Sequence, residues 1–162
     1  MNVLIKKAGM DDLDLLIEWR MRVISEVFAT DVSKDSELIR KNNEEYYKEN
    51  LKNNSHTACF AICMDTGEIV GCGGICYQKE MPSPDNQTGT NGYIMNIYTM
   101  PEVRGEGIGR MIIQFLIKDA KQRGTEKIYL ESSKIAKKLY REIGFTDIED
   151  YMKLPHRETR HG

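Results

Sequence analysis

A strand, a glycine-rich corner and an amphipathic helix follow one another between residues 92 and 124, and this stretch constrains the fold most. The helix is predicted from apolar residues that recur at helical spacing, namely Ile108, Met111, Ile112, Phe115, Leu116 and Ala120. Gly124 stands just past its expected end, as is usual at a helix C-terminus. Strands over 92–99 and 127–131 flank the helix, so we expect a parallel, right-handed crossover.

The corner before that helix has the composition of an anion-binding site. The first N–H groups of a helix lack intrahelical partners, and the helix dipole adds partial positive charge there. Gly105, Gly107 and Gly109 have no Cβ atoms, so a ligand can approach the backbone closely. Arg104 and Arg110 flank them and could clamp phosphate. The corner therefore predicts a pyrophosphate cradle at a helix N-terminus.

Two common nucleotide-binding motifs do not fit this corner. A P-loop needs a glycine, four intervening residues and then Gly-Lys. Counted from Gly105, the second glycine of that motif would fall on Arg110. The dinucleotide pattern G-x-G-x-x-G, started at Gly105, also places its third glycine on Arg110. Glu131 ends the next strand, roughly where an acidic ribose ligand would lie, so a nucleotide binder stays an alternative.

The pattern that does fit is Arg104-x-x-Gly107-x-Gly109, which resembles the acetyl-coenzyme A motif of the GNAT (Gcn5-related N-acetyltransferase) superfamily. The preceding residues 97–101 resemble that family's strand and turn, with Thr99 where an aliphatic residue is usual.

A second segment strengthens the resemblance. Residues 133–145 resemble the family's Asn-x-x-Ala-x-x-Leu-Tyr-x-x-x-Gly-Phe and depart from it only by Ser133 in place of Asn. The resemblance extends over nearly the whole chain and is firmest from about residue 92 to 145.

The resemblance implies an α/β (mixed α+β) fold of three layers. Its central sheet is mixed and mostly antiparallel, contains a splayed parallel pair, and is flanked by helices. A length of 162 residues fits one domain, so we expect a single acetyltransferase domain over 1–155 and a polar tail over 156–162. A last short strand is expected at 150–154, after a helix that Ser132 or Ser133 caps.

The activity implied by the resemblance is N-acetyl transfer from acetyl-CoA to a primary amine, by direct attack in a ternary complex. The residues that match the family's coenzyme-binding positions are Ile97, Tyr98, Thr99, Arg104, Gly105, Glu106, Gly107, Ile108, Gly109, Arg110 and Ser133. Tyr140 matches a tyrosine that faces the thioester sulfur and can protonate it. Glu131 is our candidate general base, His56 is a weaker one, and Asn96 could orient water or substrate.

Two other functions stay open from the residues alone. One is a non-catalytic acyl-CoA-binding regulatory module on the same fold. The other is a covalent-cysteine acyltransferase, since the chain has Cys59, Cys63, Cys72 and Cys76 on two strands of a hairpin. If 64 and 69 flank the hairpin turn, all four face the same side. Free cysteine is often a small core residue, and the C-x2-C spacing of common zinc sites is absent, so we expect no metal.

The N-terminal half is less informative. The strand over 69–78 is interrupted by three glycines, Gly71, Gly73 and Gly74, which suggest a bulge or a close backbone approach. A polar helix over 31–54 could form a substrate lid. In the helix before it, three side chains could project toward a substrate, namely Trp19, Arg20 and Arg22.

Charge and hydropathy limit the partners. The formal net charge of −2 gives no electrostatic case for nucleic acid or an anionic membrane. No apolar run is long enough to span a bilayer, and no signal-peptide pattern opens the chain, so we expect a cytoplasmic protein. The acceptor is expected to be a small-molecule or peptide amine of unknown identity, and a homodimer is a possible assembly.

Overall fold

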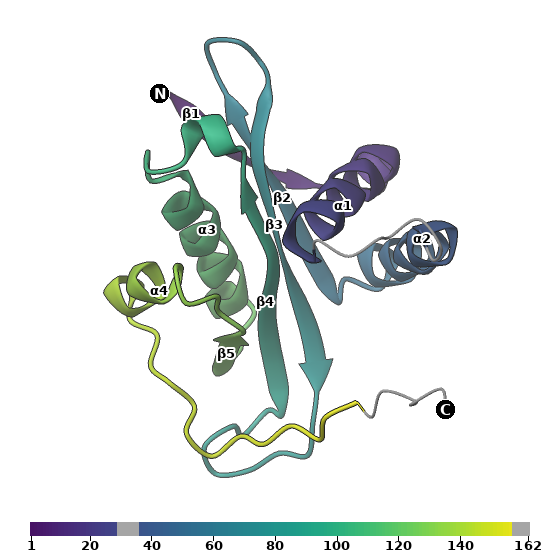
Figure 1. The fold of residues 1–162 in the computed structure, drawn as a ribbon. Helices are drawn as coiled ribbons and strands as arrows, with labels where there is room; N and C mark the ends of the chain where they lie inside the picture. The colour runs from purple at the N-terminus through teal and green to yellow at the C-terminus, as the bar shows by residue number, and fades with distance from the viewer. Residues whose placement is uncertain (29–35, 157–162) are drawn as a thin grey trace, which may run out of the picture. The chain divides into compact units, whose positions relative to one another are not determined.

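The computed structural model describes residues 1–28 and 36–156, and the contacts between Cα atoms divide the chain into two compact units. The first unit spans Met1–Glu131 and contains the sheet (Figure 1). The second spans Ser132–Gly162 and contains helix α4 (Lys137–Ile143). The single domain expected over 1–155 stays a prediction.

The elements of the first unit follow the expected order of strands and helices. They are β1 (Val3–Ala8), η1 (Met10–Asp12), α1 (Leu13–Phe28), α2 (Ser36–Lys52), β2 (His56–Cys63), β3 (Ile69–Lys79), β4 (Thr90–Thr99), η2 (Pro101–Val103), α3 (Ile108–Gln122) and β5 (Lys127–Leu130).

In the described residues these strands form one five-stranded sheet in the order β1-β2-β3-β4-β5. The pairs from β1 to β4 are antiparallel, whereas β4 and β5 are parallel. The parallel pairing runs only from Asn91↔Lys127 to Ile94↔Leu130. Residues 95–99 of β4 therefore extend past β5, which is the splayed pair of the expected fold (Figure 1).

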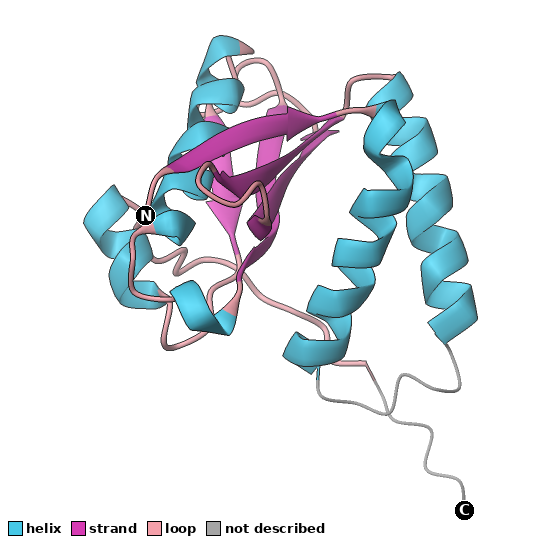
Figure 2. Ribbon diagram, turned by 90° about the horizontal axis from the view of Figure 1, so that it is seen from above, coloured by secondary structure: helices cyan, strands magenta, loops and turns pink. Residues whose placement is uncertain are grey.

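Helices cover both faces of the sheet, so the unit has three layers (Figure 2). Helices α1 and α2 pack on one face, and α3 packs on the other. The core between α1 and the sheet includes Leu16, Trp19, Val23, Phe60 and Tyr98. The buried face of α3 consists of Ile108, Ile112, Ile113, Leu116 and Ala120. The helical spacing of these apolar residues thus places α3 on the sheet.

Two of the β3 glycines meet close neighbours. A Cβ atom on Gly71 would lie 2.7 Å from the carbonyl oxygen of Tyr98, and one on Gly73 would lie 2.4 Å from Ile112 Cγ2. Beside Gly73 the pairing of β3 with β4 shifts register, between Cys72 and Gly74. The expected bulge and close approach are both confirmed.

The four cysteines do not share one face, so that prediction was wrong. Cys72 lies opposite Phe60, whereas Cys59 lies opposite Gly73. Residues opposite each other point to the same face, so Cys59 and Cys63 face one way and Cys72 and Cys76 the other. The cause is an irregularity between Ala61 and Ile62, because a shift of one residue moves side chains to the other face.

The second unit differs from the prediction in two places. Residues 150–154 contain no strand, and α4 begins at Lys137 rather than directly after Ser133. The Ser133 hydroxyl instead accepts a hydrogen bond from the Ala136 N–H at 3.3 Å, which fixes the turn before the helix. Gly144 ends α4 with a φ of +121°, as expected for a C-terminal glycine.

The described residues contain neither a membrane-spanning helix nor a cluster of metal-binding side chains. No helix there is long and apolar enough to cross a membrane. In the same residues, no group of three or more His, Cys, Asp or Glu side chains is placed to hold a metal ion.

Candidate functional site

The first part of the site is a bulge in β4, immediately after its pairing with β5 ends. Between Cys72↔Tyr98 and Gly74↔Met95, two residues of β4, Asn96 and Ile97, stand opposite a single residue of β3. Asn96 adopts a left-handed conformation with φ +60°, which asparagine tolerates better than most residues. Among the described residues the bulge thus lies where β4 has no neighbouring strand on its β5 side, so backbone groups on that side have no ladder partner there.

The second part is the corner between η2 and α3. Gly105 and Gly107 have φ values of +87° and +82°, which β-branched residues rarely adopt. A Cβ atom added at either position would have no atom within 4 Å, so the space above both residues is open. Gly107 caps α3, and no side chain caps that helix end. An anion can therefore reach the backbone at the start of α3, as the cradle requires.

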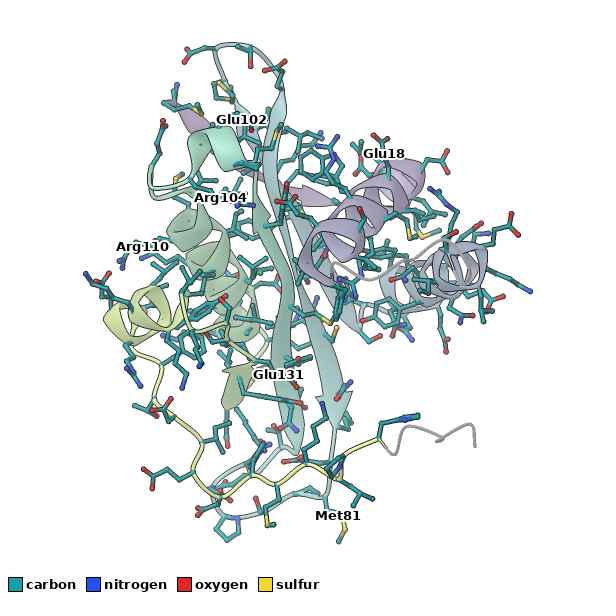
Figure 3. The ribbon with its side chains drawn as sticks, in the orientation of Figure 1. Glu18, Met81, Glu102, Arg104, Arg110 and Glu131 are labelled. Carbon is teal, nitrogen blue, oxygen red and sulfur yellow. The ribbon has the colours of Figure 1, made fainter. Side chains whose placement is uncertain are left out.

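Arg104 lies beside this corner, but its guanidinium is engaged within the protein (Figure 3). Its Nε donates to the carbonyl oxygen of Thr99 at 3.1 Å, and its Nη2 donates to Glu26 Oε1 at 3.0 Å. The Tyr98 hydroxyl donates to the same carboxylate. Arg104 thus ties the corner to α1, and its role as a phosphate clamp stays a prediction. Arg110 lies on the side of α3 away from the sheet (Figure 3).

The other coenzyme-binding candidates divide into backbone and side-chain contributors. Tyr98 is buried against Trp19 with ring centroids 6.1 Å apart, so only its backbone could meet a ligand. Trp19 was expected to project toward a substrate, and that expectation was wrong, because it belongs to the core. Glu106 is half exposed and lies 4.0 Å from the N-terminal amine of Met1.

On the α1 and α2 side of the sheet, polar side chains gather against the β4 bulge. Arg20 Nη1 donates to Asn96 Oδ1 at 3.0 Å, and Arg20 Nε donates to Asn43 Oδ1 at 3.3 Å. Asn43 in turn donates to the carbonyl oxygen of Ile39 at 2.8 Å, which fixes its orientation on α2. This chain of contacts connects both helices to the residue that forms the bulge.

His56 lies near this group. Its Nδ1 is 2.8 Å from the Tyr46 hydroxyl and 3.5 Å from Cys76 Sγ. Its Nε2 is buried and has no hydrogen-bond partner in the described part of the chain. Burial, followed by the charges of Arg20 and Arg123, lowers the pKa of His56 to about 4. A group with that pKa is poorly matched to proton abstraction near neutral pH.

Glu131 ends the first unit, exposed and just beyond β5 (Figure 3). Burial raises the pKa of Tyr93, and the nearby Glu131 carboxylate raises it further. Tyr93 stacks on Tyr129 with ring centroids 4.9 Å apart. Glu131 therefore stands next to the point where β4 and β5 separate, and its role as a base stays a prediction.

Tyr140 and Ser133 belong to the second unit. Tyr140 is buried and packs edge-on against Phe145, with ring centroids 5.8 Å apart. Burial raises the pKa of Tyr140, so its hydroxyl is protonated at neutral pH, as a general acid must be.

Sequence reasoning missed Glu26, Asn43 and Tyr46. Glu26 is one of several charged residues on α1, and Asn43 and Tyr46 belong to a polar helix without a motif. The only sequence signal was Arg20 on the otherwise apolar face of α1.

Comparisons with known proteins concern the family and the fold of the chain. The sequence model described as "Acetyltransferase (GNAT) family" matches residues 20–145. A glucosamine 6-phosphate N-acetyltransferase of Trypanosoma brucei brucei is 29% identical, over 55% of this chain and 58% of that protein. An IAA acetyltransferase of Azospirillum brasilense is 30% identical, over 54% of each chain. The chain thus spans little more than half the length of these curated relatives.

Solved structures extend the comparison to nearly the whole chain. A predicted acetyltransferase from Clostridium acetobutylicum, crystallised with acetyl-CoA, has a TM-score of 0.82 and 29% identity over 95% of this chain and 96% of its own. A GCN5-related N-acetyltransferase from Ralstonia eutropha JMP134 has a TM-score of 0.80 over 95% of this chain and 99% of its own. At 19% identity, this second likeness concerns the fold.

Proposed function

Because the chain belongs to the acetyltransferase (GNAT) family, we propose that it transfers an acetyl group from acetyl-CoA to a primary amine, by direct attack in a ternary complex. The observation that carries this proposal is the open start of α3, which no side chain of the described residues caps, together with a β4 bulge beyond the end of the described pairing with β5. That arrangement offers backbone donors to a diphosphate and, a few residues earlier, to a carbonyl group.

The residues that would hold the coenzyme lie on one path along the chain. The backbone of Ile97 and Thr99 would meet the pantetheine arm, and the backbone from Gly105 to Arg110 would bind the pyrophosphate. When bound, acetyl-CoA supplies a thioester carbonyl that an amine can attack. A backbone N–H in the bulge that donates to this carbonyl would stabilise the negative charge formed on its oxygen.

The protein must also deal with the amine proton. A lysine-like amine has a pKa near ~10.4, so its neutral form at pH 7 costs roughly 4.6 kcal/mol in water. In the transfer a C–N bond forms, the C–S bond breaks, and the amine loses one proton while the thiolate can gain one. We assign the first proton to Glu131, directly or through water, and the second to the Tyr140 hydroxyl. Ser133 is assigned to coenzyme binding.

Three of the four cysteines give a covalent mechanism little support. Burial raises the pKa of Cys59 and of Cys72 to about 12, and it raises that of Cys76. These thiols are therefore neutral at physiological pH, whereas the thiolate is the nucleophile. The names of the relatives point instead to small amines such as glucosamine 6-phosphate, which supports a small-molecule acceptor.

The test measures coenzyme A release from acetyl-CoA with a panel of amines, together with thermal stability. We expect amine-dependent release, and a rise in melting temperature with acetyl-CoA that NAD and ATP do not match. Ligand at 100 times its Kd adds about 2.7 kcal/mol of stability. Intact mass after mixing with acetyl-CoA alone should show no acetyl group on the protein. Binding without release for any amine would identify a regulatory acyl-CoA-binding module instead.

A further inference from the structure

Arg20 presents a positive charge that no carboxylate of the described residues pairs with. It is partly buried on α1, and it donates hydrogen bonds to the neutral amide oxygens of Asn43 and Asn96. Among residues 1–28 and 36–156, no carboxylate lies within 4 Å of its nitrogen atoms, and Glu26, on the same helix, pairs with Arg104 instead. A guanidinium has five N–H donors, so most of its capacity is unused by these residues.

The titratable groups around Arg20 cannot supply the missing charge. Those whose pKa its charge affects are Tyr46, Tyr47, His56, Cys72 and Cys76. Burial is the largest influence on each, raising the pKa values of the tyrosines and cysteines and lowering that of the histidine. All five side chains are therefore uncharged near pH 7. Partial burial of an unpaired cation costs free energy, which an anionic ligand at this place would offset.

Arg20 is also held in a fixed position. Asn43 on α2 accepts a hydrogen bond from one N–H group of Arg20, and Asn96 on β4 accepts one from another. Asn96 directly precedes Ile97, the residue whose backbone is assigned to the pantetheine arm in the proposed function. A guanidinium fixed in this way loses little conformational freedom when it binds an oxyanion.

We propose that Arg20 binds an anionic group, a carboxylate or a phosphate, carried by the acceptor amine. This inference rests on the proposed acetyl transfer and narrows its acceptors to amines that also carry a negative charge. It sets this chain apart from acetyltransferases of polycationic amines, because the unpaired guanidinium would repel such acceptors.

The test compares amines that differ only in the anionic group. L-Lysine against L-lysinamide tests for a carboxylate, and phosphoethanolamine against ethanolamine tests for a phosphate. We expect the wild type to acetylate the anionic member of at least one pair with the higher kcat/KM. Arg20→Gln should raise the KM for that acceptor about 10- to 100-fold and affect its neutral partner much less, so the preference for the anionic amine should fall. Arg20→Lys should restore part of the loss.

A matched control lies two residues away. Arg22 carries the same charge on the same helix but is exposed and stacks over the Trp19 ring at 4.5 Å. Arg22→Gln should keep the preference for the anionic amine. Acetyl-CoA affinity and melting temperature, measured for every variant, separate a folding defect from an acceptor defect.

Three results would overturn the inference. The wild type could show no preference for the anionic member of either pair, or Arg20→Gln could keep that preference. Arg20→Gln could also slow all amines equally, which would mean that Arg20 only positions Asn96. If no amine is acetylated, the proposed function fails. The anion site is then tested separately, with inorganic phosphate as the ligand. Phosphate should raise the melting temperature of the coenzyme A-saturated wild type more than that of Arg20→Gln, and equal shifts would refute the anion site.

Discussion

Replacing Gly73 by alanine tests the packing that holds the β4 bulge in place. The added Cβ would lie 2.4 Å from Ile112 Cγ2, 2.8 Å from Ile97 Cδ1 and 3.3 Å from Leu116 Cδ1. Ile112 and Leu116 are fully buried, so neither has free space to move into. Ile97 is the contact that can yield, and its displacement would distort the bulge. The same substitution thus perturbs both the core and the proposed carbonyl donor.

The size of the effect follows from this crowding. Extra methyl groups in a packed core cost about 1–3 kcal/mol. For a chain of this length, that free energy lowers the melting temperature by about 2–12 °C. Urea unfolding should show a lower midpoint with an unchanged slope, since the surface exposed on unfolding stays the same. Where the protein stays folded, we expect kcat for acetyl transfer to fall more than the affinity for acetyl-CoA.

Two further variants make the result decisive. Gly9→Ala is the matched control, because a Cβ there meets no atom within 4 Å and its φ of −134° suits alanine, so its cost should be within about 0.5 kcal/mol. The double variant Gly73→Ala/Ile112→Ala lacks the methyl group that crowds the new Cβ. Its loss of stability should therefore be smaller than the sum of the losses of the two single variants. The reasoning fails if Gly73→Ala is as stable as Gly9→Ala, or if the double variant is strictly additive.

Three other predictions address the cradle, the acid and the partly buried carboxylate of Asp119. Gly107→Val should abolish acetyl-CoA binding in calorimetry while the far-UV spectrum is kept, and unchanged affinity would make the corner merely structural. Tyr140→Phe should lower kcat about 100-fold with little change in acetyl-CoA affinity, and more than Tyr129→Phe does; full activity would refute its role. Asp119 accepts hydrogen bonds from Tyr77 at 2.6 Å and Thr57 at 2.8 Å. Although burial raises its pKa, these bonds and the Arg123 charge bring that pKa below its usual value. Asp119→Asn should therefore destabilise the protein above about pH 5. In urea titrations this difference in stability should shrink below about pH 4, because there the carboxylate of the unfolded chain binds a proton more readily than that of the folded protein. A pH-independent difference would contradict that assignment.

The sequence by itself determined the features that depend on neighbours along the chain. The glycine corner, α3 and its C-terminal end follow from spacing, φ requirements and helix-end chemistry, all of which are local. The splayed parallel pair and the crossover followed from the motif, and the β3 glycines correctly predicted a bulge. Local rules succeed here because each residue's environment is set within a few positions of it.

Only the tertiary structure decided which side chains meet across the sheet. One irregularity at Ala61 and Ile62 separated the cysteines onto two faces, and no local pattern announces such a shift. Trp19 became a core residue because Phe60 and Tyr98 both pack edge-on against it. The strand expected at 150–154 did not form, since a short segment becomes a strand only when another strand pairs with it.

The same distinction holds for the site. The sequence placed Arg20 on an apolar helix face but could not say what surrounds it. Its partners Asn43 and Asn96 are 23 and 76 residues away, and its neutral neighbours come from α2, β2 and β3. Whether a charge on a helix is solvated, paired or held ready for a ligand depends on all the groups that fold around it. The set of groups around a side chain is fixed only when the chain packs. For this reason the acceptor's charge can be inferred from the structure and not from the motif.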